Sequence, residues 1–157
     1  MNRTIDTAKS LYLEDLSVGQ RFTSSQYRMD EDRMKAFAAE FDPQPFHLEE
    51  AAAERSVFHG LAASGWHTAA VTMRLLVTGG LPLANGIIGL GGEIVWSKPT
   101  RPGDMLHVES EILEVRPSQS RPDMGSLRSQ MTTFSQEDEP VLRFIALALM
   151  RRRPAAD

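Results

Sequence analysis

Residues 60–73 contain no Asp, Glu, Lys or Arg, and this feature limits the possible folds more than any other. Small side chains recur through the segment, from Ala62 and Ala63 to Ala69 and Ala70, so that other backbone can approach it on nearly every side. A helix that is apolar all round is a buried helix. This segment is too short and too polar to span a bilayer. We predict a central helix here, wrapped by the rest of the chain.

Alternating and helical patterns surround this segment and define the wrapping. Apolar side chains from Met34 to Phe41 follow helical spacing, with Asp30 as N-cap and Pro43 ending the helix, and residues 49–55 predict a short helix. Strands are predicted at residues 21–29, 87–96, 106–112, 127–134 and 141–150. One strand, then helices, then four strands with short connections indicate an α+β domain, with an antiparallel sheet packed on the buried helix.

Length and composition exclude several classes of protein. The chain has 157 residues, enough for one domain with a real core. A formal net charge of -4 provides no cationic field for nucleic acid, so no nucleic-acid partner is expected. Because there are 0 cysteines, disulfides, Cys-ligated zinc and thiol nucleophiles are excluded. Met1–Asp6 lacks the apolar core of a signal peptide, and no membrane span is expected, so we predict a soluble cytoplasmic domain that handles a small molecule.

The first sign of chemistry is an acid and a histidine that stand close together in a stiff segment. Asp42 and His47 are five positions apart, and Pro43 and Pro45 between them fix φ and favour an extended backbone. An Asp and a His aimed at the same water are what general acid–base catalysis requires. The spacing alone also fits a helix that ends at Asp42, a turn shaped by proline and a histidine packed or exposed in a loop.

The dipeptide His59-Gly60, at the start of the predicted central helix, is a second candidate site. A helix N-terminus presents unpaired N–H groups and the positive end of the helix dipole. Glycine at that position lets a carbonyl oxygen approach the backbone closely, which is the geometry of an oxyanion hole. The other interpretation is a glycine needed for packing beside a histidine that caps or packs.

Other kinds of chemistry lack their sequence motifs. The segment around Ser64 lacks the Gly-x-Ser-x-Gly spacing of a nucleophile elbow, and the glycines of residues 79–92 match neither a phosphate loop nor a dinucleotide fingerprint. His47, His59 and His67 lack the i, i+4 spacing of a helical zinc pair. We therefore predict neither a metal nor a cofactor.

Together, the candidate residues resemble the motif of the MaoC-like dehydratases, the (R)-specific enoyl-CoA hydratase branch of the hotdog-fold proteins. The family motif has an Asp, then Asn-Pro two and three positions on, His at the fifth position, and His-Gly downstream. The corresponding residues of this sequence are Asp42, Gln44, Pro45, His47, His59 and Gly60. Gln44 departs from the family's Asn and is one methylene longer, which brings the support of this turn into question.

The resemblance covers nearly the whole chain and implies its architecture. Residues 12–150 correspond to a single MaoC-like hotdog domain, with terminal tails at 1–11 and 151–157. The implied fold is an antiparallel β-sheet wrapped around a long central α-helix. The implied assembly is a homodimer, or a higher oligomer of dimers, in which two sheets continue one another. The proline turn of Lys98 and Arg101 is similar to one in the family, and both side chains are candidates for CoA phosphate contacts.

The resemblance also implies a reaction, the reversible addition of water across the double bond of a trans-2-enoyl thioester. The substrate would be an acyl-CoA or an acyl-carrier thioester, and the enzyme an enoyl-CoA hydratase or 3-hydroxyacyl-CoA dehydratase of fatty acid metabolism that needs no cofactor. Asp42 and His47 would bind and activate the water. The N–H of Gly60 would polarise the thioester carbonyl. Thr68 matches a position at which such hydratases carry a hydroxyl near the catalytic Asp.

Two other functions are compatible with the same fold. A hotdog acyl-CoA thioesterase commonly has a carboxylate on or beside the central helix, and residues 60–73 contain neither Asp nor Glu, which counts against it. A non-catalytic protein that binds acyl thioesters would keep the hydrophobic tunnel and the dimer interface. Such a protein would not need both Asp42 and His47, so their joint presence favours the enzyme.

Overall fold

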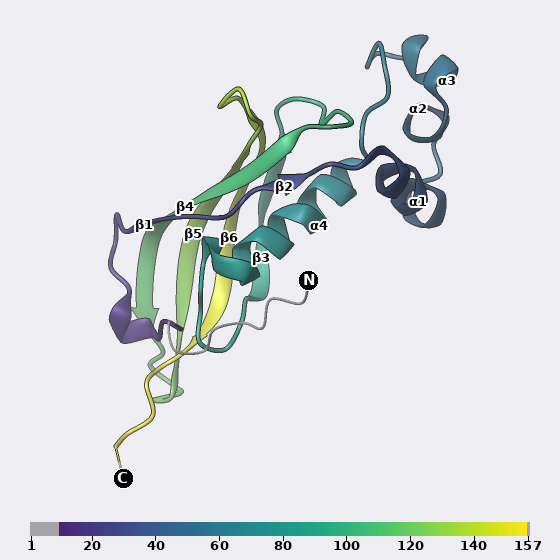
Figure 1. Ribbon diagram of the computed structural model, residues 1–157. Coiled ribbons are helices and arrows are strands. Elements are labelled where there is room, and N and C mark those ends of the chain that lie inside the picture. Colours follow the sequence, from purple (N-terminus) through teal and green to yellow (C-terminus); the bar gives the residue numbers. More distant parts are fainter. Residues whose placement is uncertain (1–9, 157) are drawn as a thin grey trace.

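The computed structural model describes residues 10–156 and shows an antiparallel sheet wrapped around one helix (Figure 1). Most of the expected tail at 1–11, including Met1–Asp6, lies outside the described residues. The helices are α1 (Glu31–Phe41), α2 (Pro45–Leu48), α3 (Glu50–Glu54) and α4 (Gly65–Leu75). The strands are β1 (Arg21–Thr23), β2 (Tyr27–Arg28), β3 (Ile88–Trp96), β4 (Met105–Pro117), β5 (Met124–Phe134) and β6 (Pro140–Arg151).

The six strands form one sheet in the order β1-β4-β5-β6-β3, and β2 also pairs with β4. Successive hairpins join β4 to β5 and β5 to β6, whereas β3 reaches its place beside β6 by a crossover. Helix α4 lies across one face of the sheet, and α1, α2 and α3 form a cap beyond one of its ends (Figure 1). The core lies between α4 and the sheet, where Val71 and Leu75 join Leu106, Ile112 and Leu127 in one buried cluster.

The predicted central helix exists, but it begins later than the sequence suggested. Residues 60–64 are not helical, and α4 starts at Gly65 and is extended by a π-helical turn, Leu76–Gly80. Gly60 has a φ of 148°, which no helix accommodates. The prediction of burial on all sides is wrong at Trp66, which is 60% exposed. The uncharged segment is therefore a buried extended stretch followed by a helix.

The single strand predicted over residues 21–29 is divided into β1 and β2, both of which pair with β4. Ser24 lies at the interruption, where its N–H donates to the carbonyl of Val108 and its Oγ accepts the N–H of Val108. A side chain thus replaces one backbone acceptor of the ladder. The other predicted strands are confirmed, with ends shifted by a few residues.

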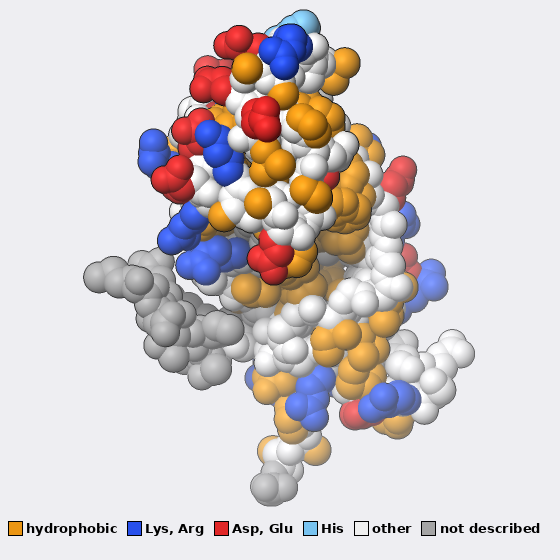
Figure 2. Space-filling view, turned by 90° about the vertical axis from the view of Figure 1, so that its right-hand side faces the viewer, with side chains coloured by type: hydrophobic (Ala, Val, Ile, Leu, Met, Phe, Trp, Pro, Cys, Tyr) orange, Lys and Arg blue, Asp and Glu red, His pale blue; other side chains and the backbone are white. Residues whose placement is uncertain are grey.

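Strand β3 is an edge strand whose second side has no partner among residues 10–156. A bulge between Gly89 and Gly91 shifts its register with β6, so side chains do not alternate regularly between its two faces. Ile88 and Leu90 remain exposed on it. The face shown in Figure 2 carries hydrophobic side chains below the more highly charged cap. Within the described part of the chain, no helix has the length and apolar character needed to cross a membrane.

Candidate active site

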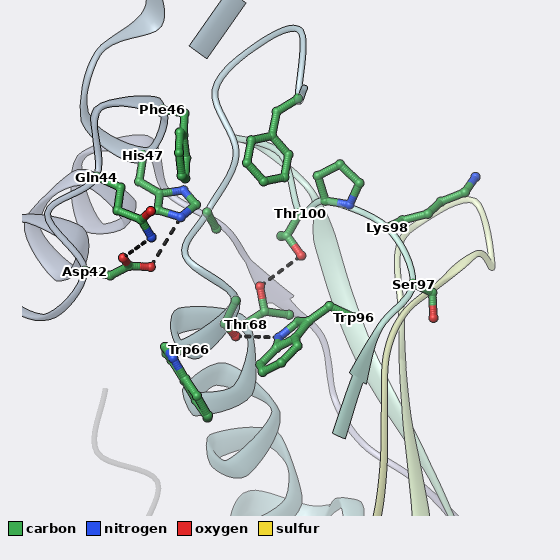
Figure 3. Close-up of a pocket in the computed structure, with 14 residues that line it drawn as sticks. Asp42, Gln44, Phe46, His47, Trp66, Thr68, Trp96, Ser97, Lys98 and Thr100 are labelled. Atoms are coloured by element: carbon green, nitrogen blue, oxygen red, sulfur yellow. Dashed lines mark hydrogen bonds and ion pairs between the residues drawn. The ribbon is translucent and has the colours of Figure 1, made fainter. Parts of the chain in front are cut away.

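A cavity of about 420 Å³ opens where the α1–α3 cap, the N-terminus of α4 and the end of β3 meet (Figure 3). Four aromatic side chains contribute to its walls, those of Phe46, Phe58, Trp66 and Trp96. Asp42 and His47 line the same cavity and bring ionisable groups to it. The structure therefore brings together, in one pocket, the acid and the histidine singled out from the sequence.

The backbone of residues 42–47 explains why both side chains face one place. Helix α1 ends at Phe41, and the N–H of Asp42 makes the last helical bond, to Ala38. Pro45 occupies the first position of α2, where the missing proline N–H costs nothing, so His47 lies on a helical turn. The expected extended backbone is thus wrong beyond Gln44, and the turn directs His47 back toward Asp42.

Three neighbours surround the carboxylate of Asp42. Gln44 Nε2 donates to Oδ1 at 2.6 Å, Ser64 Oγ donates to Oδ2 at 2.7 Å, and His47 Nε2 lies 3.3 Å from Oδ2. Partial burial raises the pKa of Asp42, but the hydrogen bonds from Ser64 and Gln44, together with the charge of His47 whenever its ring is protonated, outweigh it, and the net pKa lies below its ordinary value. Asp42 is therefore held as a carboxylate. The longer side chain of Gln44, which replaces the Asn of the family motif, therefore still supports the catalytic turn by a hydrogen bond to Asp42.

A second bond fixes the imidazole of His47, which is 5% exposed. Its Nδ1 lies 2.7 Å from the carbonyl oxygen of Ala62. A carbonyl only accepts hydrogen bonds, so Nδ1 carries the proton in this contact. In the neutral ring, Nε2 is then an acceptor directed at Asp42. Two acceptors converge on one point of the cavity, which suits a molecule with two O–H donors.

Gly65, the first residue of α4, brings a backbone N–H group to the wall of the cavity. Gly65 lines the pocket, and among residues 10–156 its N–H has no hydrogen-bond acceptor. The indole of Trp96 donates to the Gly65 carbonyl at 2.8 Å. A Cβ at position 65 would lie 2.8 Å from Trp96 Nε1, so a side chain there would displace the indole.

The structure does not bring Gly60 to the cavity in the expected way. Its N–H donates to the carbonyl of Ala53 at 3.2 Å, and it does not line the pocket. The expectation rested on a helix beginning at Gly60, whereas α4 begins five positions later in the sequence. Thr68 does line the pocket, but its hydroxyl donates to Thr100 at 3.0 Å rather than to Asp42.

Ser64 is the residue that the sequence analysis missed. It is fully buried and supplies Asp42 with the hydroxyl contact expected of Thr68. From the sequence, Ser64 was considered only as a possible nucleophile. Its place four residues after Gly60 carried no signal, because the extended path of residues 60–64 was predicted to be helical.

His67 is a second buried histidine, but it does not line the pocket. It stacks on Phe37 with ring centroids 4.7 Å apart, and has its pKa lowered by desolvation. Its Nδ1 has no partner in the described structure. Within residues 10–156, no group of three or more His, Asp or Glu side chains is arranged to hold a metal ion.

An antiparallel sheet wrapped around one long helix is the arrangement of the hotdog fold. The chain belongs to the MaoC-like dehydratase family, since the MaoC like domain matches residues 15–132. The resemblance seen in the sequence is thus confirmed, as is the hotdog fold.

Relatives support this assignment at different distances. The structure of a MaoC-like dehydratase from Rhodospirillum rubrum is 59% identical, with a TM-score of 0.91 over 93% of this chain and 100% of that one. An (R)-hydratase from Pseudomonas aeruginosa is 27% identical, with a TM-score of 0.71 over 94% and 93% of the two chains. A 3-hydroxybutyryl-CoA dehydratase from Methylorubrum extorquens is 30% identical over 94% of this chain and 88% of its own. Membership of this family indicates hydratase or dehydratase activity.

Proposed function

We propose that the protein is an (R)-specific enoyl thioester hydratase that also catalyses the reverse dehydration of a 3-hydroxyacyl thioester. The observation that carries the proposal is the convergence of Asp42 Oδ2 and His47 Nε2, 3.3 Å apart, in a pocket with aromatic walls. Each group is fixed by a separate partner, Ser64 for the carboxylate and the Ala62 carbonyl for the imidazole. A water bound by both acceptors is oriented and made more nucleophilic.

Hydration then needs one bond to form at each end of the double bond. The oxygen of the bound water attacks the β-carbon of the enoyl thioester, and one of its protons passes to the Asp42–His47 pair. The electron pair moves toward the thioester carbonyl, and the proton that the Asp42–His47 pair took from water is then delivered to the α-carbon, which completes the addition and returns the pair to its starting state. No redox step or covalent enzyme intermediate is involved. This matches a pocket that contains acid–base groups but no activated nucleophile.

The N–H of Gly65 is the donor that we assign to the thioester carbonyl oxygen. It lies at the positive end of the α4 dipole and has no acceptor within residues 10–156. Gly60, the donor expected from the sequence, has its N–H bonded to Ala53. Placing the carbonyl at Gly65 also keeps the acyl chain against the indoles of Trp66 and Trp96. These two rings lie edge to face, with their centroids 5.2 Å apart.

The reaction is tested with purified protein and trans-2-enoyl-CoA substrates of increasing chain length, followed by loss of the enoyl thioester absorbance. Asp42→Asn and His47→Gln are each expected to lower kcat by on the order of 10²-fold or more. Arg121→Ala, in the exposed β4–β5 connection, serves as the control. Parental rates in both site variants, or release of free CoA thiol instead of hydration, would contradict the proposal. Binding of acyl-CoA without turnover would indicate a non-catalytic binding protein.

We also propose that β3 pairs with β3 of a second copy, so that the two sheets become continuous. The open side of β3 and the exposed Ile88 and Leu90 support this, since an unpaired apolar edge is a template for another strand. Leu90→Lys is expected to convert a dimer to monomers in sedimentation experiments. Val18→Lys, at a site that is 68% exposed and distant from β3 in sequence, should leave the dimer intact. A monomeric parent protein would refute the pairing.

A further inference from the structure

Arg101, in the connection between β3 and β4, binds three backbone carbonyls of a distant loop. Its Nη1 donates to Gly60 O at 2.8 Å and to Leu61 O at 3.2 Å, and its Nη2 donates to Phe58 O at 2.5 Å. No carboxylate lies within ion-pair distance of the guanidinium in the described chain. The two terminal nitrogens are thus committed to backbone oxygens, which does not suit the CoA phosphate contact expected from the sequence.

The loop that Arg101 binds has a backbone that needs external support. His59 has a φ of 51° and Gly60 a φ of 148°, and a left-handed conformation is unfavourable for a residue such as His59. The carbonyls on either side of this bend converge on the planar guanidinium, whose fixed fork of donors suits several oxygens at once. The residue before Arg101, Thr100, holds the same loop farther on, since its carbonyl accepts the N–H of Ala63 at 2.9 Å.

The carbonyl of Ala62 lies between these two points of attachment. It follows directly after Leu61, which Arg101 holds, and precedes Ala63, which Thr100 holds. This carbonyl accepts the hydrogen bond from His47 Nδ1 at 2.7 Å. The position of Ala62 O therefore decides which ring nitrogen of His47 carries the proton and how the ring is turned toward Asp42.

We propose that Arg101 is a positioning residue: by clamping the carbonyls of Phe58, Gly60 and Leu61 it places Ala62 O so that His47 keeps its proton on Nδ1 and presents Nε2 to Asp42. Arg101 does not contact the reacting atoms and acts only through the loop backbone. Its effect on rate rests on the proposed hydratase function. Its effect on the histidine is a property of the folded protein and does not depend on any substrate.

The decisive measurement is the 15N–1H NMR spectrum of the histidine side chains, which distinguishes an Nδ1–H ring from an Nε2–H ring. The parent should show His47 as one Nδ1–H tautomer, assigned by comparison with His47→Gln. Arg101→Ala should show a mixture of tautomers, and Arg101→Lys should as well, because an ammonium group lacks the planar fork. Arg121→Ala should match the parent. Circular dichroism establishes that each variant is folded.

The kinetic arm uses the same proteins with trans-2-enoyl-CoA. We expect kcat of both Arg101 variants to fall by roughly 10- to 100-fold with little change in KM, since a misplaced catalytic group affects turnover more than binding. If Arg101→Ala does not fold, Arg101→Lys decides. A folded variant with an unchanged His47 tautomer overturns the proposal, whatever its rate. If the parent protein is inactive but its His47 tautomer still changes in the Arg101 variants, the hydratase assignment is wrong and the positioning role of Arg101 is supported.

Discussion

Two segments meet at the pocket, and they are held in place in opposite ways. Residues 42–47 are organised by contacts among themselves: Gln44 donates to Asp42 from its backbone N–H at 2.7 Å and from its side chain at 2.6 Å. Residues 58–64 are held from outside, mainly by Arg101. The first segment carries the ionisable side chains. The second supplies the carbonyl and hydroxyl that orient them.

The site has two requirements, and each segment meets one: the first fixes the backbone that carries the ionisable side chains, and the second places the groups that orient those side chains. A segment that organises itself keeps its backbone through local hydrogen bonds, so changes elsewhere in the chain act on its side chains rather than on its backbone. A segment held from outside depends on residues that are remote in sequence, and it is sensitive to substitutions that never touch substrate. The predictions below separate the two kinds of support, in order of decreasing effect.

Ser64→Ala removes the hydroxyl that links the second segment to the carboxylate of the first. A hydrogen bond to a charged group contributes about 1.5–3 kcal/mol, so kcat/KM is expected to fall at least about tenfold. The pKa of Asp42 should rise, because the bond from Ser64 lowers it. The acid limb of the pH–rate profile should therefore move to higher pH. Steady-state rates of hydration between pH 4 and pH 8 measure both effects.

Ser120→Ala, in an exposed turn, is the matched control and should reproduce the parental profile. The sign of the shift also governs stability. A carboxyl group with a lowered folded-state pKa stabilises the fold above its unfolded-state pKa, near 3.8, and this contribution is lost as pH falls through the folded value. Ser64→Ala should reduce that acid sensitivity. An unchanged acid limb would show that Ser64 does not act on Asp42.

Gly65→Ala tests the outer wall of the pocket while leaving residues 42–47 untouched. The new Cβ would meet the indole of Trp96, which must leave its bond to the Gly65 carbonyl. Overpacking of this kind costs about 1–3 kcal/mol. We expect a lower melting temperature, altered tryptophan fluorescence and a raised KM. An unchanged emission spectrum would mean that Trp96 does not pack on Gly65.

Thr68→Val examines the helix beneath the second segment. The substitution removes the donor to Thr100, and a buried hydroxyl without its partner costs about 1 kcal/mol. The rate should fall less than in Ser64→Ala, because Thr68 does not bond Asp42. Thermal unfolding and hydration rates on the same samples compare the two. A larger loss of rate than in Ser64→Ala would return Thr68 to the role expected from the sequence.

Gln44→Asn, the residue of the family motif, should have the smallest effect. The backbone bond between the two residues persists, and the shorter amide changes only one neutral donor, so the rate should change by no more than about threefold. Gln44→Ala provides the contrast, since it removes the donor altogether and should raise the pKa of Asp42. Equal losses in the two variants would show that the first segment needs the longer side chain.

The same contrast explains how far the sequence could predict the site. Asp42 and His47 were found because both lie in one short segment with a recognisable spacing. Ser64 was missed because its segment takes its path from Arg101, about 40 residues away in the chain, and local patterns carry no information about such contacts. The start of the central helix at Gly60 was wrong for the same reason.

Most of the sheet was predictable, because alternation of apolar and polar side chains marks strands that bury one face. β4, β5 and β6 fall close to their expected ranges. The division of residues 21–29 was not predictable, since it depends on Ser24 replacing a backbone acceptor opposite Val108. The bulge in β3 was not predicted, since it depends on how the glycine-rich stretch at residues 89–92 pairs with β6.

The pairing of β3 also determines when this protein can become active during its synthesis. β3 carries Trp96 to the pocket, yet its one strand partner among residues 10–156 is β6, the last strand of the chain. A nascent chain can form the α1–α3 cap and bring Asp42 to His47 early, because those contacts are close in sequence. It cannot fix the Trp96 wall until residues 140–151 have left the ribosome.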